Sequence, residues 1–208
     1  VQIADAMSQY RNYSNLAESY STITSRFLAI THGVSAVGKS SVAMHMVEEL
    51  GAVRLRSDVE RKRLLGEQQG ENTLQAGIYS ADASNATYAH LNKIANSVLR
   101  SGSPVVLDAT FLKHEHRYAA SKIAEANGEL FLILDCRATP AVIDRWIAKR
   151  KSDKNDPSDA TLTIIEEQQN NREPLRAEEL LLSKLVETNE IGAMDDLVAH
   201  IRKLLPGR

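Results

Sequence analysis

Short apolar runs alternate with amphipathic segments along most of this chain. The apolar runs have the length of buried strands and end at polar or glycine-containing turns; they lie at residues 27–31, 52–56, 104–107 and 130–134, with a weaker one at 184–188. Between them, apolar residues recur at helical spacing, at residues 41–50, 85–101, 114–127, 139–152, 159–172 and 193–205. The alternation predicts an α/β fold in which helices cover both faces of a mostly parallel, five-stranded sheet.

The N-terminal part of the chain has a different pattern. Apolar residues recur at roughly helical spacing over residues 2–24, which predicts one or two amphipathic helices before the first strand. No linker rich in proline, glycine or serine divides the rest of the chain. We therefore expect an N-terminal helical appendage over residues 1–24 and one domain over residues 25–208.

The turn after the first apolar run fits the phosphate-loop pattern G-x-x-x-x-G-K-[ST] at every fixed position. Its residues are Gly33, Val34, Ser35, Ala36, Val37, Gly38, Lys39 and Ser40. A strand before this turn and a helix after it create a nest of backbone N–H groups at the positive end of a helix dipole, which can hold a phosphate. This loop, with Ser41, is expected to bind a nucleoside triphosphate, ATP or GTP; Lys39 reaches the β- and γ-phosphates, and Ser40 holds Mg²⁺.

The loop makes the fold prediction more specific. We expect a P-loop NTPase, a three-layer α/β/α sandwich in which ligands bind outside the carboxyl ends of the strands. Asp108 ends the third apolar run. It could hold Mg²⁺ opposite Ser40, as a Walker B carboxylate does, or cap the next helix. Thr110 could cap that helix or touch phosphate.

A second polar cluster follows the second apolar run. If a helix starts near Ser57, Asp58 and Arg61 share one of its faces. A kinase that acts on a hydroxyl needs such a pair: a base for the hydroxyl proton, and a cation for the acceptor or the transferring phosphoryl group. The alternative is that Asp58 is an N-cap with an ordinary i,i+3 ion pair.

The helix predicted over residues 139–152 carries a run of basic residues and leads into a polar stretch. This arrangement resembles the helical lid of small P-loop kinases, which supplies an arginine to the developing charge. Arg145 and Arg150 are equally good candidates, and Arg172 is a third. A solvated basic helix face is the alternative interpretation.

Composition narrows the class of protein. A net charge of −2 and a pI near 6.3 lack the basic excess of a protein that grips duplex nucleic acid, although a local basic patch would escape this count. No stretch approaches 18 apolar residues, and the N-terminus has no signal-peptide pattern. The single cysteine, Cys136, ends an apolar run, so we expect a buried thiol. These observations predict a cytoplasmic protein without membrane contact.

His114 and His116 could be mistaken for metal ligands. On a helix, residues two apart point to different faces, and no second pair of His or Cys completes a zinc site. We expect both to be surface residues.

Several segments together resemble a bacterial family of AAA-type, zeta-toxin-like P-loop proteins. The similar segments are residues 30–40, 53–63, 77–80, 108–111 and 171–175, which spread the resemblance over about residues 26–190. In that family the P-loop domain often follows an aminoglycoside-phosphotransferase-like domain. The resemblance implies that the helices expected over residues 1–24 could be the end of an upstream domain that has been removed, which would explain why the chain begins at Val1 rather than at Met.

The wider group is similar to phage polynucleotide kinase, gluconate kinase and chloramphenicol phosphotransferase. An Asp-x-x-Arg of polynucleotide kinase supplies its base and its acceptor-contacting arginine, and Asp58 and Arg61 stand at the matching positions. One departure is Ala36-Val37, where relatives commonly carry Gly-Ser. These positions vary within the loop pattern, so nucleotide binding is little affected.

The sequence leaves three functions open. The first is an ATP- and Mg²⁺-dependent kinase that phosphorylates a hydroxyl of a small molecule. The second is a nucleotide-binding regulatory module that senses triphosphate for an attached catalytic domain. The third is a 5′-hydroxyl polynucleotide kinase, against which the near-neutral charge argues mildly.

Overall fold

The computed structural model describes residues 25–66, 81–152 and 162–205, together with six positions between residues 7 and 14. Those six positions are helical and exposed. The rest of the predicted appendage, the segment 77–80 and the polar stretch after residue 152 lie outside the described residues. The division of the chain at residue 25 therefore stays a prediction.

A five-stranded parallel sheet forms the centre of the domain. Its strands stand in the order β2-β3-β1-β4-β5. Their bounds are β1 Phe27–His32, β2 Val53–Arg56, β3 Val105–Asp108, β4 Leu130–Arg137 and β5 Ser183–Glu187. Every pair of neighbouring strands is parallel, so all carboxyl ends meet at one edge of the sheet.

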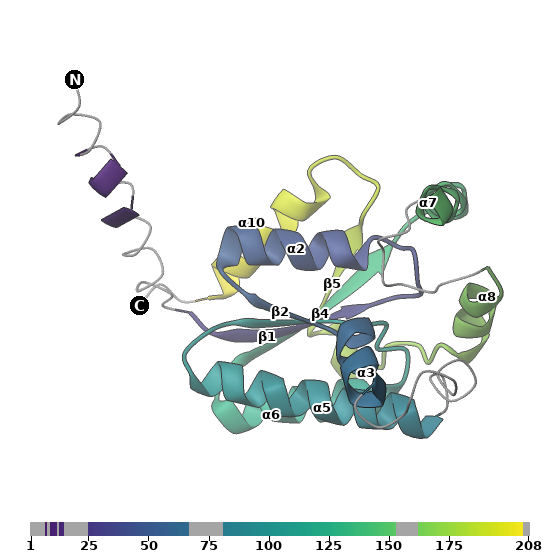
Figure 1. Cartoon of the computed structure of the whole chain (residues 1–208), viewed down its shortest axis with the longest axis horizontal. Coiled ribbons are helices and arrows are strands. Elements are labelled where there is room, and N and C mark those ends of the chain that lie inside the picture. Colours follow the sequence, from purple (N-terminus) through teal and green to yellow (C-terminus); the bar gives the residue numbers. More distant parts are fainter. Residues whose placement is uncertain are drawn as a thin grey trace.

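Helices cover both faces of this sheet (Figure 1). Helices α2 (Lys39–Leu50) and α10 (Ala193–Leu204) lie on one face. On the other lie α3 (Ser57–Gly66), α5 (Ala81–Arg100) and α6 (His114–Asn127). Beyond the carboxyl ends of the strands stand α7 (Pro140–Ser152) and α8 (Leu162–Asn171); the single turn α9 (Ala177–Leu180) leads into β5. The predicted three-layer P-loop fold is confirmed.

The strands sort their side chains into two hydrophobic cores. In the central strand β1, Phe27 and Ala29 pack with α2 and α10, while Leu28 and Ile30 pack with α5 and α6. All six residues of β1 are buried, because a parallel strand covered on both faces has no solvent side. This is why β1 reads in the sequence as a continuous apolar run rather than an alternating one.

Cys136 is buried in the first of these cores, as expected. Burial raises the pKa of its thiol to about 12, which keeps it protonated and unreactive. Within the described part of the chain, every helix is too short or too polar to cross a bilayer.

Candidate functional site

The phosphate loop connects β1 to α2 with a backbone that needs glycine at two positions. Gly33 has a φ of +137°, and a Cβ there would lie 2.6 Å from the Cys136 carbonyl oxygen. Gly38 has a φ of +84°, and a Cβ there would lie 2.8 Å from the Thr188 hydroxyl. The Thr188 hydroxyl itself lies 2.7 Å from the Val37 carbonyl oxygen, so the end of β5 supports the loop.

Lys39 bends back over its own loop. Its ammonium group donates a hydrogen bond to the Val34 carbonyl oxygen at 2.6 Å. Although Lys39 is the first residue of α2, its side chain is therefore held across the turn, next to the loop amides. This is the position from which it would meet phosphate oxygens.

Ser40 and Asp108 lie together where the loop meets the end of β3. The Ser40 hydroxyl donates to Asp108 Oδ2 at 3.0 Å. The first residue of α6 is His114 and its N-cap is Lys113, so neither Asp108 nor Thr110 caps that helix. The capping alternative for both residues is excluded.

The Ser40 and Asp108 oxygens fit a magnesium ion. A hydroxyl and a carboxylate are hard oxygen ligands, which Mg²⁺ prefers, with phosphate and water completing its shell. Arg54 of β2 also donates to Asp108, from Nε at 3.0 Å and from its terminal nitrogen. Among the described residues all these contacts reach Oδ2, which leaves Oδ1 for a metal or its water ligand.

Asp58 lies in the first turn of α3, directly after β2. Its carboxylate receives two hydrogen bonds from the Arg56 guanidinium, at 3.1 and 2.6 Å, and one from the Val59 amide at 2.9 Å. Asp58 is the second residue of α3 rather than a cap before it. Because Arg56 pairs with Asp108 in the register of β2 and β3, the Asp58 cluster adjoins the candidate metal ligands.

Arg61 lies within electrostatic range of Tyr88 on the neighbouring helix α5. Burial raises the pKa of the Tyr88 phenol, while Thr110, Phe111 and the charge of Arg61 act in the opposite direction. The Tyr88 hydroxyl lies 3.2 Å from Thr110 Oγ1 and accepts the Phe111 amide at 3.1 Å. Tyr88 thus contacts the loop after β3 through Thr110 and Phe111, and the charge of Arg61 acts on this tyrosine.

The three predicted phosphate-contacting arginines lie in different places. Arg145 is exposed on α7, and no described contact joins it to the loop. The side chain of Arg150 lies outside the described residues. Arg172, directly after α8, donates from Nε to His32 Nε2 at 3.1 Å and from its terminal nitrogen to Asp135 at 3.2 Å. Of the two described arginines, Arg172 lies closer to the loop, because His32 directly precedes Gly33.

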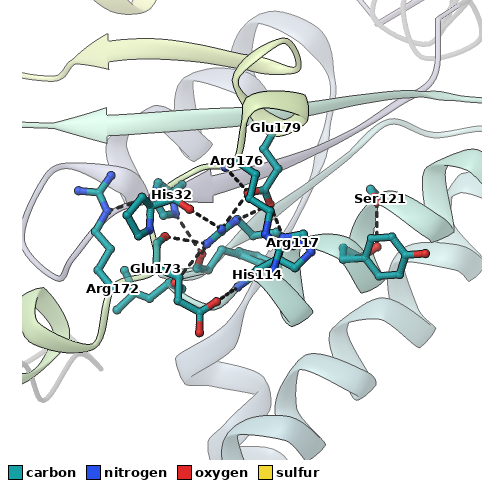
Figure 2. A network of polar contacts seen from close by, with 12 residues as sticks. His32, His114, Arg117, Ser121, Arg172, Glu173, Arg176 and Glu179 are labelled. Carbon is teal, nitrogen blue, oxygen red and sulfur yellow. Dashed lines mark hydrogen bonds and ion pairs between the residues drawn. The ribbon is translucent and has the colours of Figure 1, made fainter.

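A polar network anchors the segment that contains Arg172 (Figure 2). At its centre is Arg117 of α6, which is fully buried. Arg117 pairs with Glu179 at 2.7 and 2.9 Å and donates to the carbonyls of Phe111, Leu112, Glu173 and Pro174. Glu173 accepts a hydrogen bond from the His114 amide at 2.7 Å, which gives a partner to one of the free backbone N–H groups at the start of α6. The network fixes residues 172–179 against the core.

The expectation that His114 and His116 are surface residues is wrong. The His114 side chain is 20% exposed and lies 3.2 Å from Glu179 Oε1. His116 is 12% exposed; its ring stacks on Tyr88 at a centroid distance of 3.9 Å. The helix packs both residues against neighbouring segments, which their spacing in the sequence does not reveal.

Sequence reasoning missed three residues that contact the phosphate loop or the Asp108 carboxylate. Arg54 shares a strand face with Arg56, so period-two alternation in β2 was a usable signal for it. Thr188 directly follows β5, where a polar residue is expected to face the loop. Gln168 of α8 accepts the Ser35 amide at 2.7 Å, and nothing in its sequence surroundings marks it.

The chain matches a known family over most of its length. The model of the AAA domain family matches residues 28–175, which contain the phosphate loop, Asp108 and Arg172. An uncharacterized protein of Mycobacterium tuberculosis is 33% identical over 141 residues, 66% of this chain and 28% of that protein. This chain thus spans well under half the length of the relative.

Two solved structures show the same fold at low sequence identity. A sugar kinase from a Janibacter species is 16% identical, with a TM-score of 0.62 over 86% of this chain and 93% of that one. The APS kinase of Mycobacterium tuberculosis, in complex with AMPPNP and APS, is 19% identical, with a TM-score of 0.59 over 86% of this chain and 97% of that one.

Proposed function

The chain belongs to the AAA domain family, and on that basis we propose that it is an ATP- and Mg²⁺-dependent kinase that transfers the γ-phosphoryl group to a hydroxyl of a small molecule. The observation that carries this proposal is the 3.0 Å contact between Ser40 and Asp108, beside a complete phosphate loop. This contact brings two magnesium-type ligands together next to Lys39, the phosphate-binding lysine that directly precedes Ser40.

Each residue of the site has a role in this reaction. The loop amides and Lys39 bind the phosphates. Ser40 and Asp108 would hold Mg²⁺, which neutralises charge on the β- and γ-phosphates when bound. The acceptor hydroxyl oxygen attacks the γ-phosphorus, the bond to the β–γ bridging oxygen breaks, and ADP leaves.

Asp58 is the proposed base for the hydroxyl proton. The two hydrogen bonds from Arg56 orient its carboxylate. Oδ1 accepts both Arg56 Nε and the Val59 amide, whereas Oδ2 accepts one described hydrogen bond and keeps a lone pair for the acceptor. Arg61, in the next turn of α3, is the proposed contact for the acceptor. Arg145 and Arg150 remain proposed contacts of the transferring group, alongside Arg172.

Two alternatives have their own support. The relative extends far beyond the aligned region, which favours a module within a larger protein and thus a nucleotide sensor for an attached domain. A 5′-hydroxyl polynucleotide kinase has support from the arginines near Asp58, which could pair with an acceptor phosphate.

The test is phosphoryl transfer from labelled ATP and Mg²⁺ to a panel of sugars, aminoglycosides, nucleosides and 5′-hydroxyl oligonucleotides. Lys39→Ala serves as the blank. Transfer by the wild type that is lost in the blank would support the kinase, and the labelled compound names the acceptor class. Nucleotide binding without transfer to any acceptor would favour the sensor.

A second measurement isolates the base. With the acceptor identified, Asp58→Asn should lower kcat by about 10²- to 10⁴-fold, as expected for the loss of a general base. Asp196→Asn on α10 is the matched control, because Asp196 is exposed and lies outside the site. Unchanged turnover in Asp58→Asn would remove Asp58 from the mechanism.

A further inference from the structure

One peptide unit of the phosphate loop is held from both edges. Its carbonyl, of Val34, accepts the Lys39 ammonium at 2.6 Å, and its amide, of Ser35, donates to Gln168 Oε1 at 2.7 Å. Lys39 and Gln168 therefore lie on opposite edges of the same peptide plane. The peptide that holds Lys39 is therefore also held by a side chain of α8.

The orientation of the Gln168 carboxamide follows from this contact. A backbone N–H only donates, so the atom that faces Ser35 must be the carboxamide oxygen. The carboxamide is planar, so its NH₂ group lies directly beside that oxygen. Gln168 thereby brings two uncharged hydrogen-bond donors to the loop.

Arg172 also brings hydrogen-bond donors to this end of the phosphate loop. It follows Gln168 by four residues and lies directly after the end of α8. Gln168 contacts the loop at Ser35, and Arg172 contacts His32 immediately before the loop. The end of α8 therefore presents neutral and charged donors to the phosphate loop.

We infer that Gln168 is a triphosphate-binding residue whose NH₂ group donates to the γ-phosphate. This inference rests on the proposed function. The start of α2 takes the β-phosphate, since the helix dipole and its amides are there. The Val34–Ser35 peptide precedes the start of α2 in the loop. A donor next to this peptide therefore reaches the γ-phosphate, which follows the β-phosphate. Gln168 then makes the site selective for triphosphate over diphosphate.

Two variants of Gln168 separate this role from simple support of the loop. Gln168→Ala removes both the Ser35 contact and the NH₂ donors. Gln168→Glu keeps an oxygen for the Ser35 amide but replaces the donors with a negative charge. Gln169→Ala is the matched control, because Gln169 is an exposed neighbour on the same helix. Binding of MgATP and MgADP is measured by titration calorimetry, with folding checked by circular dichroism.

We expect Gln168→Ala to weaken MgATP binding by about tenfold to a hundredfold, the usual effect of losing a hydrogen bond to a charged group. Its MgADP affinity should change by less than about threefold, which is within the effect of a weak contact. Gln168→Glu should weaken MgATP binding at least as much, because its charge repels the phosphate. Gln169→Ala should match the wild type.

The inference is overturned if Gln168→Glu binds MgATP like the wild type, since Gln168 would then only support the Ser35 amide. Equal losses for MgATP and MgADP would also overturn it. If Lys39→Ala loses nucleotide and Gln168→Ala does not, the inference fails while the proposed nucleotide site stands. A folded wild type that binds no MgATP would overturn both.

Discussion

Gly38 stands at the point where the phosphate loop, α2 and the end of β5 meet. Its φ of +84° is unfavourable for any residue with a Cβ, and that Cβ would also lie 2.8 and 2.9 Å from Oγ1 and Cβ of Thr188. Because Cβ of Thr188 is fixed to the backbone, the side chain cannot rotate away from the contact. The loop therefore demands glycine for both conformation and space.

Gly192 offers a matched comparison at the residue scale. It has the same φ of +84° at the start of α10, but open space surrounds the position where a Cβ would be. Gly192→Ala should cost about 1 kcal/mol of unfolding free energy, from backbone strain alone. Gly38→Ala should cost about 1–3 kcal/mol more, since overpacking adds to that strain, and should abolish nucleotide binding.

Urea denaturation of both variants, with titration of MgATP, measures this difference. Equal destabilisation by the two substitutions would show that Thr188 moves away from the added Cβ without loss of stability. Retained nucleotide affinity in Gly38→Ala would show that the loop tolerates a displaced amide.

Residues of the site differ in how far the sequence could predict them. Lys39, Ser40 and Asp108 belong to a local pattern and to the end of a strand, and backbone geometry alone brings them to one edge of the sheet. The partners of Asp58 and Ser35 depend on side-chain packing. Arg56 was within reach of strand alternation, whereas Gln168 comes from a helix 133 positions away in the chain.

His32 joins three elements at the end of β1. Its Nδ1 lies 3.0 Å from the Phe111 carbonyl oxygen, and its Nε2 accepts from Arg172. A carbonyl only accepts and the arginine Nε–H only donates, so both bonds require the neutral ring with its proton on Nδ1. Burial, with the charge of Arg172 second, lowers the pKa of His32 to about 4.

This lowered pKa predicts an acid-sensitive junction between β1, the loop after β3 and the segment after α8. The unfolded chain protonates His32 below its ordinary pKa of 6.5, while the folded protein resists protonation down to about 4. The stability supplied by the neutral ring is thus present above pH 6.5 and is lost as the pH falls toward 4. From pH 7 to pH 5 we expect His32 to account for a loss of about 2 kcal/mol.

Chemical denaturation of the wild type and of His32→Gln at several pH values between 7 and 5 checks this expectation. The variant starts less stable, because it loses part of the junction, but it should show a shallower decline with acid. Parallel declines in the two proteins would assign the acid sensitivity to other groups.

At the scale of elements, strongly patterned segments were predictable and irregular ones were not. The pattern located all five strands and α6 over residues 114–127. It placed the start of α5 at 85 rather than at Ala81, because the first turn, Ala81 to Ser84, contains only small or polar residues and no large apolar side chain. It ended the fourth strand at 134, whereas β4 continues through Asp135 and Arg137, whose side chains bond each other.

Across the whole molecule, one buried ion pair connects the middle of the chain to its C-terminal part. Arg117 is fully buried and Glu179 is 7% exposed, and the pair links α6 to the turn that leads into the edge strand β5. Burial alone would raise the pKa of Glu179, but the hydrogen bonds from Arg117 and the Arg176 amide outweigh it and lower the pKa to about 2. Glu179 therefore stays ionised at every pH well above 2.

Glu179→Gln tests whether this pair holds the domain together. The substitution preserves shape but leaves the Arg117 charge buried among neutral acceptors, so we expect a loss of about 3–5 kcal/mol in unfolding free energy. Glu49→Gln is the control: Glu49 pairs with Arg202 on the surface, where both side chains are largely exposed, and its loss should cost under about 1 kcal/mol. Because residues 172–179 also carry Arg172 to the phosphate loop, Glu179→Gln should weaken MgATP binding even under conditions where the protein remains folded.

Equal losses of unfolding free energy for the two substitutions in urea denaturation would mean that backbone carbonyls alone satisfy the hydrogen-bond donors of Arg117. The C-terminal segment would then be held by its hydrogen bonds rather than by charge.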